Sequence, residues 1–294
     1  MSNRFTRVAQ AAVVMALAGF VAASGAGAQE LLVKDGETIA FLGDSITAGG
    51  VASPSGYVRL AISGLAANGI KAKAIPAGVG GHKSNQMLER LEQDVLSKKP
   101  NWMTMSCGVN DVWHGERGVP LDLYKQNITA IIERCQAAGV KVMILTATMI
   151  GEDQANPNNQ KLIAYNDFLR ALAKEKKCPL ADLNAVMQAA IKNAPAGHKG
   201  NVLTADGVHM NVAGNQMMAT GVLKGFGLNA EQLQKAQTVW LDIPEACDAC
   251  GRVWIPIRQW QQLEVVAAQK KQSVSELLNA ELAKAVEALT KPQK

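Results

Sequence analysis

The chain has 294 residues, enough for one sizeable hydrophobic core and a smaller appendage. Its formal net charge is +5, but the basic residues are dispersed, which excludes the basic stripe on which nucleic-acid binding depends. Aromatic residues make up 4% of the chain against 48% for all hydrophobic residues, a composition that suits a β-sheet covered by helical layers.

The first 28 residues have the features of a secretory signal peptide. Arg4 and Arg7 precede an apolar run from Ala11 to Ala23, and Ala26-Gly27-Ala28 ends in a small-x-small cleavage pattern. A single membrane anchor is the alternative, which the shortness of the apolar run disfavours. We therefore expect export to the periplasm or the medium, with no stable membrane insertion after cleavage.

Residues 29–228 alternate between short apolar segments and amphipathic segments. This alternation predicts an α/β domain in which helices cover both faces of a parallel sheet. The expected strands are Thr38–Leu42, Ala72–Ile75, Trp102–Ser106, Val140–Thr146 and Pro179–Leu183. The expected helices are Tyr57–Asn68, Ser84–Ser97, Leu121–Ala138, Gln160–Lys176 and Asn211–Phe226.

The pattern changes near Asn229, so residues 229–294 are expected to form a small, mostly helical C-terminal extension. Ser273 and Glu276 have the spacing of a capping box at the start of its last helix. The expected segments are a polar helix or linker at Asn229–Gln237, an extended stretch at Trp240–Ile257, and helices at Gln259–Lys271 and Ser273–Leu289.

Two interpretations of this extension are open. A strand at Arg252–Ile257 followed by two helices faintly resembles a ribbon–helix–helix unit, which in an exported protein would join two chains into a homodimer rather than bind DNA. The alternative is a plain helical hairpin packed against the main domain. Within the extended stretch, Cys247 and Cys250 favour a local disulfide over a redox role, and a structural zinc site would need a second such pair.

The most informative motif is Gly43-Asp44-Ser45, which directly follows the expected strand Thr38–Leu42. It places a serine hydroxyl at the carboxyl end of a strand, where open α/β sheets bind their ligands. A serine in such a turn commonly caps a helix, so the motif indicates a nucleophile only when a base and oxyanion donors accompany it.

Three later loops contain residues of these types. Gly78-Val79-Gly80-Gly81 follows the second expected strand and offers backbone N–H groups, while Asn110 follows the third and offers a side-chain amide. Asp206 and His209 precede the last helix of the domain, and an acid at this spacing can orient an imidazole as a general base. Each motif alone has a structural explanation, whereas their ordered combination is specific.

This combination resembles the motifs of the SGNH hydrolase superfamily, the GDSL-type esterases, over about Thr38 to Gly227. The resemblance implies a three-layer αβα, flavodoxin-like fold with a parallel sheet. It also implies a serine esterase that needs no cofactor or metal, in which Ser45, His209 and Asp206 form the catalytic triad.

The resemblance further implies an oxyanion hole made of the Ser45 N–H, the Gly81 N–H and the side-chain amide of Asn110. Gly80 is the alternative to Gly81 as the backbone donor, because both close the same glycine run.

For the substrate, a short acyl group, most simply acetyl, on a carbohydrate is the favoured hypothesis, because the chain carries an export signal and lacks a long apolar lid. Asp44, interpreted mainly as a structural residue, is with Gly80 and Trp113 a candidate for substrate contact, and Trp113 could stack on a sugar ring. The alternative is a lysophospholipase, lipase-like or thioesterase activity on longer acyl chains. The complete set of motifs disfavours a non-catalytic binding module.

Overall fold

The computed structural model describes residues 31–194, 200–243 and 257–291. These residues divide into two compact units, of which the second begins at Ala246. The expected signal peptide, Cys247 and Cys250 lie outside the described residues, as does all but the last residue of the strand expected at Arg252–Ile257.

The first unit is built on a sheet of five parallel strands in the order β2-β1-β3-β4-β5. This is the doubly wound, flavodoxin-like order, and its switch point lies between β1 and β3. The strands are β1 (Thr38–Gly43), β2 (Lys73–Gly78), β3 (Trp102–Ser106), β4 (Lys141–Leu145) and β5 (Leu180–Ala181).

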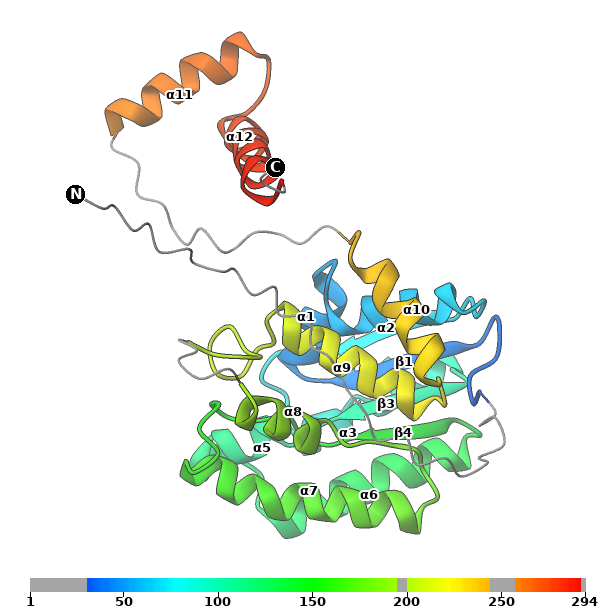
Figure 1. Ribbon diagram of the computed structural model, residues 1–294. Coiled ribbons are helices and arrows are strands. Elements are labelled where there is room, and N and C mark those ends of the chain that lie inside the picture. Colours follow the sequence, from blue (N-terminus) through cyan, green and yellow to red (C-terminus); the bar gives the residue numbers. More distant parts are fainter. Residues whose placement is uncertain (1–30, 195–199, 244–256, 292–294) are drawn as a thin grey trace, which may run out of the picture. The chain divides into compact units, whose positions relative to one another are not determined.

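Helices cover both faces of this sheet, which gives the three-layer αβα fold (Figure 1). The helices α2, α9 and α10 contact one another on one face, while α6 packs against α3 and α7 on the other. Their bounds are α1 (Ser45–Ala52), α2 (Tyr57–Ala67), α3 (Ser84–Glu89), α4 (Leu91–Asp94), α5 (Val109–Trp113), α6 (Leu121–Ala137), α7 (Pro157–Glu175), α8 (Leu183–Lys192), α9 (Val212–Gly225) and α10 (Ala230–Trp240), with 3₁₀ turns at Leu96–Lys98 and Gly115–Arg117.

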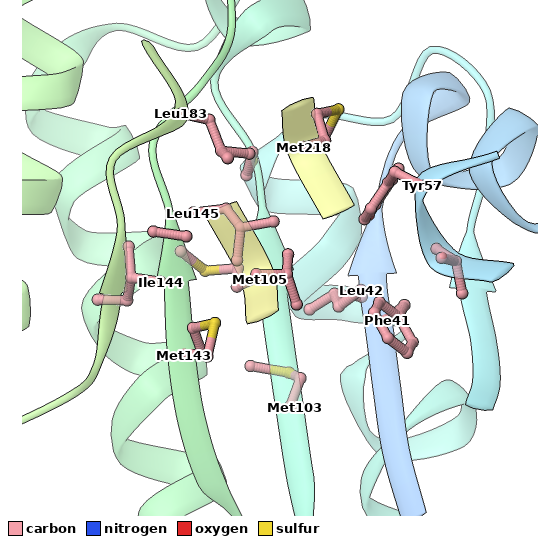
Figure 2. Close-up of a cluster of buried hydrophobic side chains, with 14 of the residues drawn as sticks. Phe41, Leu42, Tyr57, Met103, Met105, Met143, Ile144, Leu145, Leu183 and Met218 are labelled. Atoms are coloured by element: carbon pink, nitrogen blue, oxygen red, sulfur yellow. The ribbon is translucent and has the colours of Figure 1, made fainter. Parts of the chain in front are cut away.

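The central strands are apolar on both of their faces, as expected for a parallel sheet enclosed by two helical layers. Every residue of β3 is buried, and so are the last four residues of β4. Side chains from these strands pack with Tyr57 of α2 and Met218 of α9 in the buried cluster shown in Figure 2. This rigid centre holds the strand ends from which the site residues project.

The strand β2 extends past its expected end at Ile75 to Gly78, and it contains Pro76. Pro76 lacks a backbone N–H, but β2 is an edge strand with a single partner, β1, so the sheet loses no bond through it. The loop that carries Gly80 and Gly81 therefore begins directly at the carboxyl edge of the sheet.

The single helix expected over Ser84–Ser97 is wrong, because the segment breaks at Arg90 into α3, α4 and a 3₁₀ turn. The Arg90 guanidinium donates to the carbonyl oxygens of Ala77 and Gly43, each at 2.8 Å, and pairs with Asp94. The break lets one side chain bind the ends of both β1 and β2.

The division between the two units differs from the one expected at Asn229. The helix α10 belongs to the first unit because it packs against α2. Trp240 of α10 is 4% exposed, and its Nε1 donates to the carbonyl oxygen of Leu60 at 3.0 Å and to Ser63 Oγ at 3.1 Å.

The second unit contains α11 (Ile257–Gln269) and α12 (Val274–Thr290), which contact each other. Both helices were expected within three residues of these bounds. Ser273 and Glu276 form the expected capping box, in which each residue accepts the other's backbone N–H. Within the described ranges, no helix has both the length and the apolar character that crossing a bilayer requires.

Candidate active site

Ser45 is the first residue of α1 and lies directly beyond the carboxyl end of β1. The preceding residue, Asp44, caps this helix by accepting the Ile46 N–H on its Oδ1 at 2.9 Å. Gly43 is required at the turn, because a Cβ there would lie 2.0 Å from Thr47 Oγ1. The tight turn leaves the Ser45 side chain half-buried at the edge of the sheet.

The structure brings Ser45, His209 and Asp206 into one hydrogen-bonded chain. The Nε2 atom of His209 lies 2.9 Å from Ser45 Oγ, and its Nδ1 atom lies 2.6 Å from Asp206 Oδ2. A neutral imidazole carries its proton on the nitrogen that faces a carboxylate. That tautomer leaves Nε2 free to accept a proton from the serine.

The loop that carries Asp206 and His209 is a tight turn. An antiparallel bridge between Thr204 and Met210 closes it, and Gly207 has a φ of 96°. Partial desolvation raises the pKa of Asp206, but hydrogen bonds from the His209 ring and from the N–H groups of His209 and Val208 outweigh it and lower the pKa to about 2. Asp206 is therefore ionised at neutral pH.

Gly80 and Gly81 form the middle of a turn that the His82 N–H closes on the carbonyl oxygen of Val79 at 3.2 Å. Gly81 has a φ of 75°, a backbone conformation that disfavours any side chain at this position. Gly80 does not have a positive φ. A Cβ built on Gly80 would lie 3.8 Å from Ser45 Cβ, so this turn passes directly beside the serine. In the described part of the chain, no protein acceptor takes the N–H groups of Ser45 and Gly81.

Asn110 lies in α5, beyond the carboxyl end of β3, and is 4% exposed. Its Nδ2 donates to Asp44 Oδ2 at 3.2 Å and to the carbonyl oxygen of His82 at 3.3 Å. Its Oδ1 lies 3.2 Å from His114 Nε2. Asn110 therefore connects the Asp44 turn after β1 with the glycine turn after β2, at the switch point of the sheet.

Comparison with known protein families shows that residues 41–217 match the GDSL-like Lipase/Acylhydrolase family. The match spans more than half of the chain and includes every residue of the hydrogen-bonded chain just described. The chain belongs to this family. It is therefore a carboxylic ester hydrolase of the SGNH superfamily, with the parallel α/β fold described above.

Similar proteins of this esterase family include an acetylxylan esterase of Geobacillus stearothermophilus, which is 26% identical over 66% of this chain and 96% of its own length. The esterase TesA of Pseudomonas aeruginosa is also 26% identical, over 63% of this chain and 86% of its own. A crystal structure of an acetyl xylan esterase, AlAXEase, superposes with a TM-score of 0.60 at 35% identity and covers 64% of this chain and 98% of that one.

Two buried carboxyl groups lie beneath the site of this esterase. Burial raises the pKa of Asp44 to about 6, although the Ile46 N–H opposes the rise, and the neighbouring Asp111 adds to it. Burial also raises the pKa of Asp111, whose Oδ1 accepts the Ser84 N–H at 2.9 Å. Asp44 is 2% exposed and its carboxylate is bonded to other protein groups. This burial does not support the contact with substrate that was considered from the sequence.

The candidate site is open to solvent. The side chains of His209 and Asp206 are 41% and 54% exposed, and Gly80 and Gly81 are also exposed. Trp113 ends α5 with 45% exposure beside His114, their ring centroids 6.1 Å apart. Among the described residues, no group of three or more acidic, His or Cys side chains could hold a metal ion.

Of two further residues that contact this site, His114 was considered from the sequence only as a residue that could line it, and Glu152 was not singled out. His114 contacts Asn110, and Glu152 contacts the loop that leads to Asp206. The four-residue spacing of Asn110 and His114 on a short helix is the signal that could have indicated the first pair. For Glu152 no local signal exists, because its partners lie about fifty residues away along the chain.

Proposed function

We propose that the protein is an exported esterase that removes short acyl groups, acetyl above all, from carbohydrates by means of a Ser45–His209–Asp206 triad. The observation that carries this proposal is the unbroken chain of hydrogen bonds from the Asp206 carboxylate through His209 to the Ser45 hydroxyl. A serine hydroxyl is a weak nucleophile at neutral pH, and such a chain is the arrangement that activates it.

The reaction proceeds by acyl transfer in two steps. His209 Nε2 takes the proton of Ser45 Oγ as the oxygen attacks the ester carbonyl, and Asp206 stabilises the resulting imidazolium. His209 then returns the proton to the leaving alcohol, which departs. In the second step water, activated by the same imidazole, attacks the acyl-enzyme and releases the carboxylic acid.

The negative charge that develops on the carbonyl oxygen is stabilised by the N–H groups of Ser45 and Gly81 and by Asn110 Nδ2. The contacts that Asn110 Nδ2 makes in the free enzyme, 3.2 Å to Asp44 and 3.3 Å to the His82 carbonyl, are long for N–H···O bonds. An oxyanion beside Nδ2 can therefore share one of its two N–H groups without rotation of the amide, because a charged oxygen is a stronger acceptor than the His82 carbonyl. Loss of one such donor costs on the order of 10²–10³ in kcat.

The exposure of the site favours a bulky alcohol and a small acyl group. A polysaccharide can reach an exposed His209 and Asp206, whereas a long acyl chain needs an apolar groove to bury its methylene groups. Trp113, exposed three residues after Asn110, offers a face on which a sugar ring can stack. Two of the similar proteins carry acetylxylan esterase names, which agrees with this substrate class.

The test is acetate release from acetylated xylo-oligosaccharides by the purified chain without its expected signal peptide. Aryl acetate and aryl decanoate are compared in parallel, and Ser45→Ala is the control for the nucleophile. We expect acetylated sugars and aryl acetate to be hydrolysed and Ser45→Ala to be inactive. A strong preference for aryl decanoate would favour the lipase-like or thioesterase alternative, and activity in Ser45→Ala would refute the triad.

Export of the protein forms part of the proposal. It is supported by the charged start, apolar run and small-residue cleavage pattern within the first 28 residues. Expression of the full chain in a bacterial host, followed by fractionation and N-terminal sequencing, should recover a product that begins near Gln29. An uncleaved chain in the cytoplasmic fraction would contradict it.

A further inference from the structure

Glu152 lies in the loop between β4 and α7, and its carboxylate accepts four hydrogen bonds from the segment Val202–Thr204. Its Oε2 accepts the Val202 N–H at 2.6 Å, and its Oε1 accepts the N–H groups of Leu203 and Thr204, both at 2.8 Å. The Thr204 hydroxyl donates to Oε1 at 2.7 Å. One half-buried side chain thus holds three consecutive residues just before Asp206.

The same loop contacts the Asp206–His209 turn at two further points. The Thr204 hydroxyl accepts the Gly207 N–H at 3.2 Å, so it connects Glu152 to the middle of the turn. The Gly151 N–H donates to the carbonyl oxygen of Gly207 at 2.7 Å. The two backbones touch there, since a Cβ on Gly207 would lie 3.3 Å from the Gly151 Cα.

The Glu152 loop is itself fixed to the start of α7. Asn159, which is 4% exposed, accepts the Ile150 N–H and donates to the carbonyl oxygens of Gly151 and Asp153. The N-cap residue Asn156 donates to the carbonyl oxygen of Ile150 at 2.6 Å. A continuous series of hydrogen bonds therefore runs from a long helix through Glu152 to the turn that carries the acid and the base.

We propose that Glu152 is a positioning residue that holds Asp206 and His209 in line with Ser45. This inference rests on the proposed triad. The side chains of Asp206 and His209 are exposed, and the turn that carries them is closed by the Thr204–Met210 bridge and by the Ala205 N–H, which donates to the carbonyl oxygen of His209 at 2.8 Å. A base displaced by about 1 Å can lower the rate on the order of 10²-fold, so such a turn needs an anchor.

The charge of Glu152 is what makes it suitable as an anchor. Burial raises the pKa of its carboxyl group, but the N–H groups of Val202 and Leu203 and the Thr204 contacts outweigh burial and lower it. The carboxylate offers acceptors only, which matches a partner segment that presents donors only. A glutamine of the same size would turn an NH₂ group toward one of these donors and lose part of the network.

The test compares Glu152→Gln with Asp153→Asn, a neighbouring loop residue. Among the described residues, the exposed Asp153 side chain bonds only the Ala155 N–H in its own turn, so this control removes one negative charge and keeps the contact. We expect Glu152→Gln to lower kcat for aryl acetate about tenfold with little change in KM, because the reacting groups move and the ester site does not. Asp153→Asn should behave like the wild type.

Active-site titration with an organophosphonate separates positioning from simple loss of folded protein. If Glu152 positions the turn, kcat per titrated site falls, and the acidic limb of the kcat/KM profile shifts to lower pH, because a misaligned Asp206 no longer stabilises the imidazolium. A Glu152→Gln enzyme with normal kcat per titrated site and a normal pH profile would overturn the proposal, even if its melting temperature fell.

Thr204→Val is the second variant, in case Glu152→Gln fails to fold. It removes the hydroxyl that joins Glu152 to the Gly207 N–H and leaves the backbone contacts of Glu152 in place. We expect a smaller loss of kcat and the same shift of the pH profile, and an unchanged profile would count against positioning. Full activity in Ser45→Ala would instead overturn the triad itself, so the two failures are distinguishable.

Discussion

The Nε2 atom of His114 lies 3.2 Å from the Oδ1 atom of Asn110. A carbonyl oxygen can only accept a hydrogen bond, so Nε2 must be the donor and must carry a proton. This contact supports the amide orientation that Asp44 and the His82 carbonyl oxygen select, because a flipped amide would turn Oδ1 toward those two acceptors. Its NH₂ group is thereby held on the side of Asp44 and the His82 carbonyl, where the proposed oxyanion site lies.

The first prediction concerns His114. Replacement by Phe removes the donor and frees the Asn110 amide to rotate, so kcat should fall about tenfold, less than the 10²–10³ expected for loss of the amide itself. His114→Gln can donate to the same oxygen and should recover part of the loss. Steady-state kinetics with aryl acetate measures both, and a His114→Phe enzyme with wild-type kcat would show that Asn110 needs no such support.

The second prediction distinguishes Gly81 from Gly80 as the backbone donor. Gly81→Ala places a side chain on a residue with a φ of 75°, at a cost of about 1–2 kcal/mol that the turn relieves by shifting its N–H groups. Gly80→Ala adds a methyl group at an ordinary 3.8 Å from Ser45 Cβ. We expect kcat for aryl acetate to fall further in Gly81→Ala, while the reverse order would assign the donor to Gly80.

Much of the fold was predictable from the sequence because the buried strands are continuous apolar runs. Trp102–Ser106 was predicted with its observed bounds, and every residue in it is buried. The short helices α1, α5 and α8 were not predicted. Each of these helices begins within three residues of the end of the preceding strand. The apolar run of the strand therefore continues into the helix, and hydrophobic periodicity does not show where one ends and the other begins.

The break at Arg90 and the role of α10 could not be predicted for a different reason. Arg90 stands in a segment with helical pattern, and only the strand ends that its guanidinium binds explain why the helix stops there. The polar segment Asn229–Gln237 was expected to be a helix or a linker, whereas α10 continues to Trp240 and three of its residues, Leu233, Ala236 and Trp240, are buried. Both features depend on contacts between distant parts of the chain.

The third prediction concerns pH. The pKa of Asp44 is raised from 3.8 to about 6. Above pH 6 the ionised carboxylate therefore lowers the free energy of unfolding by about 3 kcal/mol. Below about pH 4 the group is protonated in both the folded and the unfolded chain, and this penalty is absent. Because the folded-state pKa lies above the unfolded value, this group lowers stability as pH rises from 4 to 6. Asp44→Asn should remove that slope.

The measurement is the melting temperature of wild type and Asp44→Asn between pH 3.5 and 8. The variant should gain on the wild type as pH rises through 4 to 6. Its kcat should nevertheless fall. Asp44 accepts the Ile46 N–H on one oxygen and Asn110 Nδ2 on the other, whereas an asparagine has a single oxygen and an NH₂ group that cannot accept either donor. A constant difference in melting temperature across this range would contradict the assignment.

The last prediction tests where the first unit ends. Trp240 of α10 is 4% exposed and donates to the Leu60 carbonyl and to Ser63 Oγ, while its neighbour Leu241 is 78% exposed. Trp240→Ala should lower the free energy of unfolding by about 3–5 kcal/mol, since it leaves a large cavity beside α2. Leu241→Ala, the matched control, should change it by less than about 0.5 kcal/mol. Denaturant unfolding followed together with esterase activity measures both values. If α10 were only a linker, one of the two alternatives that the sequence left open, the Trp240→Ala enzyme would lose its activity at the same denaturant concentration as the wild type.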